Sequence, residues 1–460
     1  MDLFLTAIPL TISFLLGGLF LNILFSKKEI GSKGLFFVLA FAVGLGITAF
    51  ISFFVLIVSG GYQKTLVLAA QLILLAALLF RQFKKKPVTW PTMAMHPLQD
   101  LVMAGLIVFL LSISWQIAYQ YPSGGWDAWS VWNLKAKFIF LAGQRWVDLL
   151  SPKMWGSSPH YPLYLPLINV WIWGFFNKPA ELTPAIVSML FFLLIVLLLY
   201  ASLRRESSSW VVLLAPLLLL SSELYSTLAV SQYCDIVVGF YLLASLTSLW
   251  RAEQEQSRAW LILGCILLGI LSFTKSEGTI AALLIFMLMT IKKFLAKRSK
   301  QKFQEFIFGA IVFFLAALPT IIFNLFFSPG NQTFTNGLQS LQHPATFDRF
   351  KFCIAFLLSE MISMKWCGLW ITVIVIGLLS LKRGWQRALK IFPLSLSIYL
   401  GIVLAYCFIN TRFEIGWLLQ VTLGRILASL LPSLLFWVFA ACLNGVEGKD
   451  SKTDAQSSKS

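Results

Sequence analysis

Residues 34–58 read GLFFVLAFAVGLGITAFISFFVLIV and contain no charged side chain. About 20 consecutive apolar residues are enough for an α-helix to cross the hydrocarbon core of a bilayer. This stretch therefore predicts a transmembrane helix, and twelve other apolar runs follow the same pattern. The thirteen predicted spans are residues 3–25, 34–58, 65–80, 98–119, 181–203, 210–222, 234–250, 259–274, 278–291, 305–327, 366–381, 391–409 and 426–443.

The composition of the whole chain agrees with these spans. Of its 460 residues, 58% are hydrophobic and 12% are charged, whereas soluble domains are about half apolar and about a quarter charged. A soluble enzyme is therefore excluded. The prediction is an all-α polytopic membrane protein with about thirteen transmembrane helices.

The net charge of +17 is unevenly distributed. Seven segments hold 24 of the 36 Lys and Arg residues, and all of them fall on the cytoplasmic side if the N-terminus lies outside and the C-terminus inside. They are residues 27–33, 81–86, 204–205, 251–258, 292–302, 382–390 and the C-terminal tail. Such an excess is typical of cytoplasmic loops. The charge is thus explained without nucleic acid as a partner.

One apolar run is too short to cross. Residues 163–176 are rich in Trp but only 14 residues long, below the roughly 17 that a span needs. We expect a juxtamembrane or re-entrant helix that returns to the outer face. Residues 120–180 then form the longest outer loop, within a single transmembrane domain over residues 1–443. Residues 444–460 are expected to be a disordered cytoplasmic tail.

The first outer loop contains an acid among tryptophans, in the sequence Gly124-Gly125-Trp126-Asp127-Ala128-Trp129-Ser130-Val131-Trp132. Interfacial tryptophans are ordinary in membrane proteins, but they do not account for the acid. A partly desolvated carboxylate suits a general base. Two interpretations of Asp127 stay open: catalysis, or a helix N-cap or other structural hydrogen bond.

Basic and aromatic residues follow in the same loop. Lys135, Lys137 and Arg145 could contact lipid headgroups or bind an anionic group of a substrate. His160 and Tyr161 begin the sequence His-Tyr-Pro-Leu-Tyr-Leu-Pro. A single His without other ligands at metal-binding spacing is poor evidence for zinc, so His160 is a candidate for hydrogen bonding instead. The six cysteines show no CxxC spacing and are expected to be buried thiols.

Four more ionisable residues lie at predicted outer ends of spans, where such groups tend to be functional. Asp235 begins one span, Lys275 and Glu277 occupy the turn between two others, and Arg425 precedes the last. The structural alternatives are a mutual ion pair for Lys275 and Glu277 and snorkelling for Arg425. Their shared face favours one outer cavity surrounded by these residues.

These motifs, in this order, resemble the GT-C superfamily of integral-membrane glycosyltransferases, and specifically the family 39-like enzymes. That group includes protein O-mannosyltransferases and the aminoarabinose transferases of lipid A. The resemblance is carried by residues 125–129, 160–166 and 274–278, extends over about residues 98–280, and includes the region 422–425. It implies a GT-C-like fold in a bacterial plasma (inner) membrane.

The resemblance also implies an activity. The expected reaction moves a hexosyl or pentosyl group from a polyprenyl-phosphate donor to a hydroxyl of a lipid, glycan or protein acceptor on the outer face. Asp127 would be the general base of an inverting attack, and cations would stabilise the leaving phosphate. The residues expected to bind substrate are Lys135, His160, Tyr161, Asp235, Lys275, Glu277 and Arg425.

Two departures from the family pattern limit what is expected. Many relatives carry a second acid beside the catalytic one, but Ala128 follows Asp127. A single carboxylate is a weak site for a divalent ion, so no metal or other cofactor is firmly implied. The chain also has no large soluble outer domain, which leaves the acceptor unspecified.

Two other functions remain as alternatives. A transporter or flippase of lipid-linked sugars would place ionisable residues near the bilayer midplane and often shows repeated halves. A polysaccharide polymerase or ligase of another membrane fold would share the lipid-carrier chemistry but typically has a large late outer loop. The chain shows no repeat, and its early outer loop is the longest.

Overall fold

The computed structural model describes residues 2–83, 97–295, 300–330, 346–386, 390–410 and 413–443, and its regular structure over these residues is entirely helical. The all-helical membrane fold predicted from the sequence is therefore confirmed. The predicted tail, residues 444–460, lies outside the described residues. The longer helices are α1 (Asp2–Leu24), α3 (Lys33–Val58), α4 (Lys64–Phe83), α5 (Pro97–Gln120), α8 (Thr183–Arg204), α11 (Cys234–Gln254), α13 (Ser276–Leu295), α18 (Leu369–Gln386), α19 (Ile391–Ile409) and α20 (Ile415–Leu443).

Each of the thirteen predicted spans overlaps a helix or a bent pair of helices. Within the described residues, eight helices are individually long and apolar enough to cross a membrane. The total reaches ten if two bent pairs each count as one span, α9 (Leu214–Leu220) with α10 (Glu223–Val230) and α14 (Lys300–Ala316) with α15 (Leu318–Phe326). The protein is thus a multi-pass membrane protein, and the count of thirteen stays a prediction.

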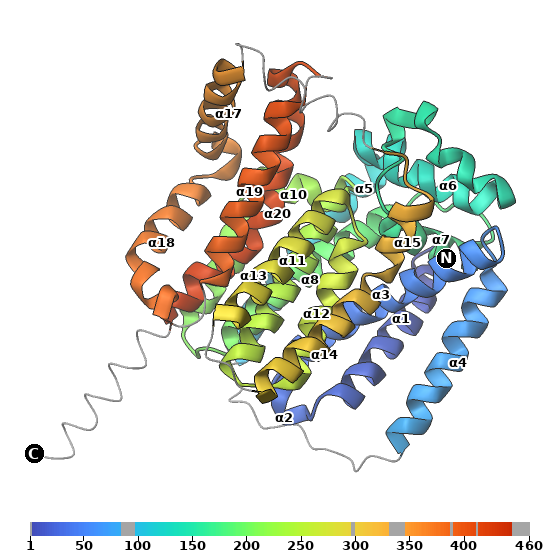
Figure 1. The fold of residues 1–460 in the computed structure, drawn as a ribbon, viewed down its shortest axis with the longest axis horizontal. Coiled ribbons are helices and arrows are strands. Elements are labelled where there is room, and N and C mark those ends of the chain that lie inside the picture. The colour runs from blue at the N-terminus through green and yellow to red at the C-terminus, as the bar shows by residue number, and fades with distance from the viewer. Residues whose placement is uncertain are drawn as a thin grey trace, which may run out of the picture.

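The centre of the bundle is α11, which is buried along its length through Arg251. It packs against α12 (Arg258–Ser272), α20 and α8. Figure 1 shows α17 (Thr346–Met361), α18 and α19 flanking one side of the bundle and α4 at the opposite edge. A helix apolar all round belongs in the interior of a bundle, and the start of this one carries Asp235.

Close helix packing depends on small residues. A Cβ at Gly17 of α1 would lie 1.9 Å from the carbonyl oxygen of Ala40, and one at Gly44 of α3 would lie 1.8 Å from that of Ser13. The hydroxyls of Ser13 and Thr48 hydrogen-bond at 2.8 Å in the same interface. Small residues with interhelical hydrogen bonds are what membrane helix pairs use in place of the hydrophobic effect. The α1–α3 pair therefore cannot tolerate larger residues here.

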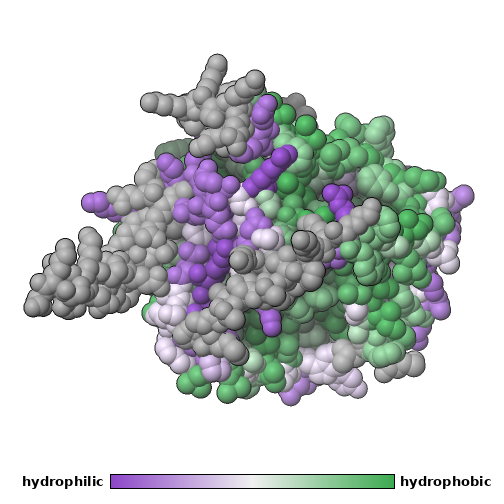
Figure 2. Space-filling view, turned by 90° about the horizontal axis from the view of Figure 1, so that it is seen from below, coloured by the Kyte–Doolittle hydropathy of each residue, from purple (hydrophilic) through white to green (hydrophobic). Residues whose placement is uncertain are grey.

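The two ends of the bundle differ. Figure 1 shows α6 (Asn133–Leu141) and its adjoining turns at one end and α2 (Lys27–Ile30) at the other. Near α2, Arg251 pairs with Glu206 at 3.0 Å and Arg205 pairs with Glu255 at 2.9 Å. Hydrophilic residues gather in a band when the molecule is viewed from below, beside a broad hydrophobic surface (Figure 2). This is the end at which the sequence predicts the cytoplasmic basic segments.

The short Trp-rich run forms α7 (Tyr164–Phe176), and nearly all of its residues are buried. It packs against α1, α3, α6 and α8. A 13-residue helix rises about 20 Å, which is less than the hydrocarbon thickness. The short helix predicted at residues 163–176 is therefore present, and its location at the outer face stays a prediction.

The sequence prediction was wrong about where the last helix begins. The last predicted span covers residues 426–443, but α20 begins at Ile415 and runs through Arg425 to Leu443. The polar residues that suggested a loop are accommodated inside the helix: the hydroxyl of Thr422 donates to the carbonyl oxygen of Leu418 at 2.6 Å. Arg425 consequently lies within the bundle, about 15 Å along the helix from its start.

Candidate active site

Asp127 is presented by a compact turn after α5. Gly124 adopts φ +67°, a conformation that residues with side chains rarely adopt, and its N–H donates to the carbonyl oxygen of Tyr121 at 3.1 Å. A single π-helical turn follows over Ala128–Trp132, and π-helical turns of this kind are frequent at functional sites. Asp127 stands at the N-terminus of this turn but makes no side-chain cap hydrogen bond. Its carboxylate points instead towards α20.

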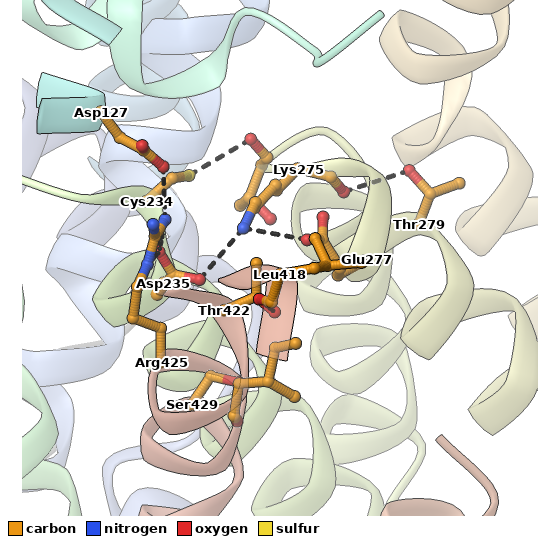
Figure 3. Close-up of polar contacts among 12 residues, drawn as sticks. Asp127, Cys234, Asp235, Lys275, Glu277, Thr279, Leu418, Thr422, Arg425 and Ser429 are labelled. Carbon is orange, nitrogen blue, oxygen red and sulfur yellow. Dashed lines mark hydrogen bonds and ion pairs between the residues drawn. The ribbon is translucent and has the colours of Figure 1, made fainter. Parts of the chain in front are cut away.

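Arg425 of α20 joins two carboxylates that are far apart in the sequence. Its Nη2 lies 2.6 Å from Oδ2 of Asp127 and 2.8 Å from Oδ2 of Asp235, and its Nε donates to the same Asp235 oxygen at 3.1 Å. Figure 3 shows the guanidinium between the two carboxylates. Arg425 is only 15% exposed at its side chain and is paired with both acids, which argues against the structural alternative of snorkelling to the interface.

Lys275 extends this arrangement on the other side of Asp235. Lys275 lies in the turn between α12 and α13. Its Nζ is 3.0 Å from Oδ1 of Asp235 and 2.9 Å from Oε1 of Glu277, which lies in the first turn of α13 (Figure 3). Burial lowers the pKa of Lys275, but the two carboxylates outweigh burial and hold this pKa well above its ordinary value. The mutual ion pair of Lys275 and Glu277 is thus present, and it includes Asp235 as well.

Asp127, Asp235, Lys275, Glu277 and Arg425 form one group, which we call the charge cluster. It brings together the loop after α5, α11, the α12–α13 turn with the first turn of α13, and α20. Two cations face three carboxylates, so the cluster carries one net negative charge when all five are ionised. A buried ion pair is stabilising only when its remaining polar atoms also have hydrogen-bond partners. Here, however, Oε2 of Glu277 is buried without a hydrogen-bond partner.

Tyr161 packs on the edge of the charge cluster. Its ring stacks on that of Trp132, with centroids 5.5 Å apart and planes within 6°, and the Nζ of Lys275 lies 5.4 Å from its ring centroid. Burial, followed by the nearby Glu277 carboxylate, raises the pKa of the Tyr161 hydroxyl far above its ordinary value. The neighbouring His160 ring contacts Tyr161 edge-on, at 4.7 Å between centroids.

Lys135 lies inside the protein and not at its surface. Its side chain is completely buried, and its Nζ donates to the carbonyl oxygens of Ser158 at 2.7 Å and Tyr161 at 3.0 Å. Direct contact with a lipid headgroup is excluded at this depth. The residue ties α6 to the turn before α7, while Lys137 and Arg145 are exposed.

Tryptophans 126 and 129 are exposed beside Asp127, and their rings pack edge-to-face at 4.4 Å, whereas Trp132 is completely buried. The three tryptophans around the acid therefore lie in two different environments, two at the surface and one in the interior. The prediction of buried thiols holds for Cys234, Cys265, Cys353 and Cys407. Cys367, which caps a 3₁₀ turn in the left-handed conformation, is exposed. Cys442 is half-buried.

Sequence reasoning missed Gln232 and Tyr233, which connect Asp127 to α11. The ring of Tyr233 lies under the guanidinium of Arg425 at 4.3 Å, and a Cβ at Gly125 would lie 2.3 Å from its hydroxyl oxygen. Gln232 is buried and adopts φ +61°. A polar pair directly before a span that begins with an acid was the only signal available.

A second ion pair that the sequence did not indicate lies next to this site. Nζ of Lys365 is 2.6 Å from Oε1 of Glu360, and the indole N–H of Trp366 donates to the same oxygen. A Cβ at Gly424 would meet that oxygen at 2.8 Å. Gly424, which precedes Arg425, therefore lets the end of α17 and the turn after it approach α20 closely.

The described part of the chain contains no group of three or more His, Cys, Asp or Glu side chains that could hold a metal ion. Within the charge cluster, Asp127 and Asp235 are both directed at Arg425. The arrangement can do two things chemically. It offers cations where an anion could bind, and beside them a carboxylate that could accept a proton.

Comparison with known proteins supports the resemblance noted in the sequence. Residues 158–335 match the family model described as dolichyl-phosphate-mannose-protein mannosyltransferase. The resemblance to the protein O-mannosyltransferases is thereby confirmed over that segment, which contains Asp235, Lys275 and Glu277. Asp127 and Arg425 lie outside it. No curated protein matches the chain.

Among solved structures, the chain is similar to the apo-state crystal structure of ArnT from Cupriavidus metallidurans, with a TM-score of 0.42 and 13% sequence identity. The match covers 74% of this chain and 60% of that one, so the chain spans less than two thirds of the length of that protein.

Proposed function

We propose that this protein is a membrane glycosyltransferase that moves a sugar from a polyprenyl-phosphate donor to an acceptor hydroxyl at the outer face. The observation that carries the proposal is the convergence of five ionisable residues from four distant segments in the charge cluster. The family match over residues 158–335 supports the same class of activity. Residues 1–443 would form one transmembrane domain, with the site in the loop at residues 120–180.

Asp127 is the general base in this proposal. It takes the proton of the acceptor hydroxyl as that oxygen attacks the anomeric carbon from the face opposite the phosphate. The bond between the anomeric carbon and the phosphate oxygen breaks, and the polyprenyl phosphate leaves with the electron pair. The new glycosidic bond has inverted configuration. A well-placed base typically contributes about 10²–10⁴ in rate.

Arg425 and Lys275 are the cations that bind the leaving phosphate. Arginine presents a planar fork that suits phosphate oxygens, and a buried setting strengthens the interaction. Asp127 and a donor phosphate would compete for the same guanidinium, since Asp127 now accepts from its Nη2. Donor binding would therefore displace the carboxylate of Asp127 and leave it available to an acceptor hydroxyl.

The remaining members of the charge cluster orient these cations. Asp235 contacts both Arg425 and Lys275, and it is the most buried of the three carboxylates. It remains as the counter-ion when Asp127 is displaced, so neither cation is left without a partner. Glu277 supports Lys275 from the opposite side.

The test is transfer of labelled sugar from a panel of polyprenyl-phosphate sugars by purified protein in lipid nanodiscs. Asp127→Asn keeps the shape of the side chain and removes the base, so transfer should fall by at least about 10²-fold. The matched control is Asp148→Asn, because Asp148 lies in the same loop but forms only an exposed ion pair with Arg145. Its activity should equal that of the wild type.

Thermal unfolding of all three proteins verifies that they are folded. Equal transfer by Asp127→Asn and wild type would rule out Asp127 as the base. A folded wild-type protein that transfers no sugar from the whole donor panel would reject the proposed activity. Transport assays with the same lipids would then address the flippase alternative.

A further inference from the structure

We propose that Gln232 is a positioning residue that sets the location of Asp127 relative to Arg425, which rests on the catalytic role proposed above for Asp127. Gln232 touches neither charged group directly. It lies three residues before Asp235, in the turn between α10 and α11. Its side-chain amide instead contacts the loop that carries Asp127, on both sides of the acid.

The first step is the pair of hydrogen bonds from the Gln232 amide. Its Nε2 donates to the carbonyl oxygen of Pro122 at 2.8 Å, and its Oε1 accepts from Nδ2 of Asn133 at 2.8 Å. Pro122 precedes Asp127 by five residues and Asn133 follows it by six. A single buried side chain thus bridges the base of the loop and uses both polar ends of its amide.

The loop is shaped to receive this residue. A Cβ at Gly124 would lie 2.8 Å from Cδ of Gln232 and 2.8 Å from the carbonyl oxygen of Ser231, to which the N–H of Gly125 donates at 3.1 Å. Both glycines therefore permit close approach of the loop to residues 231–233. Asn133 also accepts at its Oδ1 from Asn169 of α7, which continues the polar contacts into the bundle.

The backbone of Gln232 provides the third observation. Its φ of +61° lies in the left-handed region, where a residue with a long side chain is strained. Glycine would adopt this conformation without strain. A side chain that is kept here at such a cost, buried and doubly hydrogen-bonded, points to a role that only the amide can perform.

Positioning follows from the chain connectivity. Tyr233 is the next residue and packs its ring under the guanidinium of Arg425, and Asp235 binds that guanidinium two residues later. The Gln232 amide therefore fixes the loop bearing Asp127 to the segment whose next residues, Tyr233 and Asp235, contact Arg425. Arg425 is the ion-pair partner of Asp127. A displacement of about 1 Å between a base and its reaction partner can cost about 10²-fold in rate.

Gln232→Gly is the decisive variant, because it removes the amide and at the same time relieves the backbone. Its thermal stability should not fall far, whereas kcat for sugar transfer should fall by about 10- to 100-fold. The KM for the donor should change by less than about threefold, since Arg425 and Lys275 keep their places. The chain offers a matched control, Gln256→Gly: Gln256 has φ +49° but is exposed in the α11–α12 turn, where its amide donates to Glu253.

Hydrogen–deuterium exchange gives a readout that does not need activity. In Gln232→Gly, amides of residues 124–133 should exchange at least about tenfold faster, while those within α11 stay protected. Gln256→Gly should change neither exchange in this loop nor kcat. Unaltered exchange or unaltered kcat in Gln232→Gly would overturn the positioning role, as would equal loss of kcat and donor binding. If the loop loosens as expected but the wild type transfers no sugar, the proposed function fails while the structural bridge stands.

Discussion

Asp127 and Asp235 occupy different electrostatic positions on one guanidinium. Asp235 accepts two hydrogen bonds from Arg425 and one from Lys275, and its side chain is 5% exposed. Asp127 accepts a single hydrogen bond from Arg425 and is 24% exposed. Removing a fully buried partner leaves an uncompensated charge, which is costly, whereas a partly exposed carboxylate can be replaced. In the proposed mechanism, Asp235 is therefore the permanent counter-ion of Arg425 and Asp127 the exchangeable one.

This difference predicts how the protein binds an anionic lipid. A polyprenyl monophosphate should bind Asp127→Asn at least about tenfold more tightly than wild type, because the competing carboxylate is removed and the net charge of the charge cluster rises from −1 to 0. Microscale thermophoresis in nanodiscs measures both affinities, with Asp148→Asn as the control. Equal or weaker binding by Asp127→Asn would show that the carboxylate does not compete with phosphate.

Lys135 is a second case in which burial changes the behaviour of a residue. Burial lowers the pKa of its ammonium from 10.5 to about 7. Between pH values of about 7 and 10.5, the Lys135 side chain keeps its proton in the unfolded chain but has lost it in the folded protein. The free energy of unfolding should therefore rise as the pH increases from about 7 to about 10, and the residue should contribute no slope below pH 7.

The pH prediction is checked by comparing wild type with Lys135→Gln, which cannot titrate. Other groups also titrate in this range, so the quantity to follow is the difference in unfolding free energy between the two proteins at pH 7, 8.5 and 10. It should shift in favour of the wild type as the pH increases. A constant difference would mean that Lys135 keeps its ordinary pKa in the folded protein.

At the scale of elements, the site depends on how a loop docks onto a turn. The Asp127 loop could be located from its sequence, because glycines, tryptophans and an acid follow a predicted span. Its partner, the α10–α11 turn, was located only as the segment between two predicted spans, residues 210–222 and 234–250. Gly125 shows the closeness of the fit, since a Cβ there would lie 2.3 Å from the hydroxyl oxygen of Tyr233. A substitution at this glycine must displace the Tyr233 ring or separate the two elements.

Gly125→Ala should therefore reduce sugar transfer by at least about tenfold and destabilise the protein by about 1–3 kcal/mol, the usual cost of overpacking. Gly156→Ala is the matched control, because nothing lies within 4 Å of a Cβ at that position in the same outer loop. Transfer kinetics and chemical denaturation measure the two effects. Unchanged kinetics in Gly125→Ala would indicate that Tyr233 can move without disturbing Asp127.

At the scale of the whole molecule, the sequence predicts which end of the helix bundle faces the cytoplasm. The ion pairs of Arg205 and Arg251 lie at the end of the bundle opposite the Asp127 loop. The positive-inside rule assigns that end to the cytoplasm. The charge cluster would then face the side on which lipid-linked sugars are expected to be used.

Cysteine labelling tests this orientation. In a Cys367→Ser background, a cysteine introduced at Lys153 of the outer loop should react with a membrane-impermeant maleimide in intact cells. A cysteine at Ser208, which is exposed near the arginine pairs, should react only after permeabilisation. The reverse pattern would invert the topology and place the charge cluster on the cytoplasmic side.

The sequence by itself determined the class of fold and the approximate positions of the helices, and it singled out all five residues of the charge cluster. Apolar runs and charge distribution report directly on the bilayer, because each span must satisfy its own backbone within lipid. It could not determine that Arg425 lies inside α20, because polar residues inside a buried helix look like the end of a span. Only the tertiary structure decided which carboxylate faces which cation, and that Lys135 is buried while Gln232 bridges the Asp127 loop. The contact of Gln232 with Asn133 joins residues about 100 positions apart, and that of Arg425 with Asp127 joins residues about 300 positions apart. No local pattern encodes such pairings.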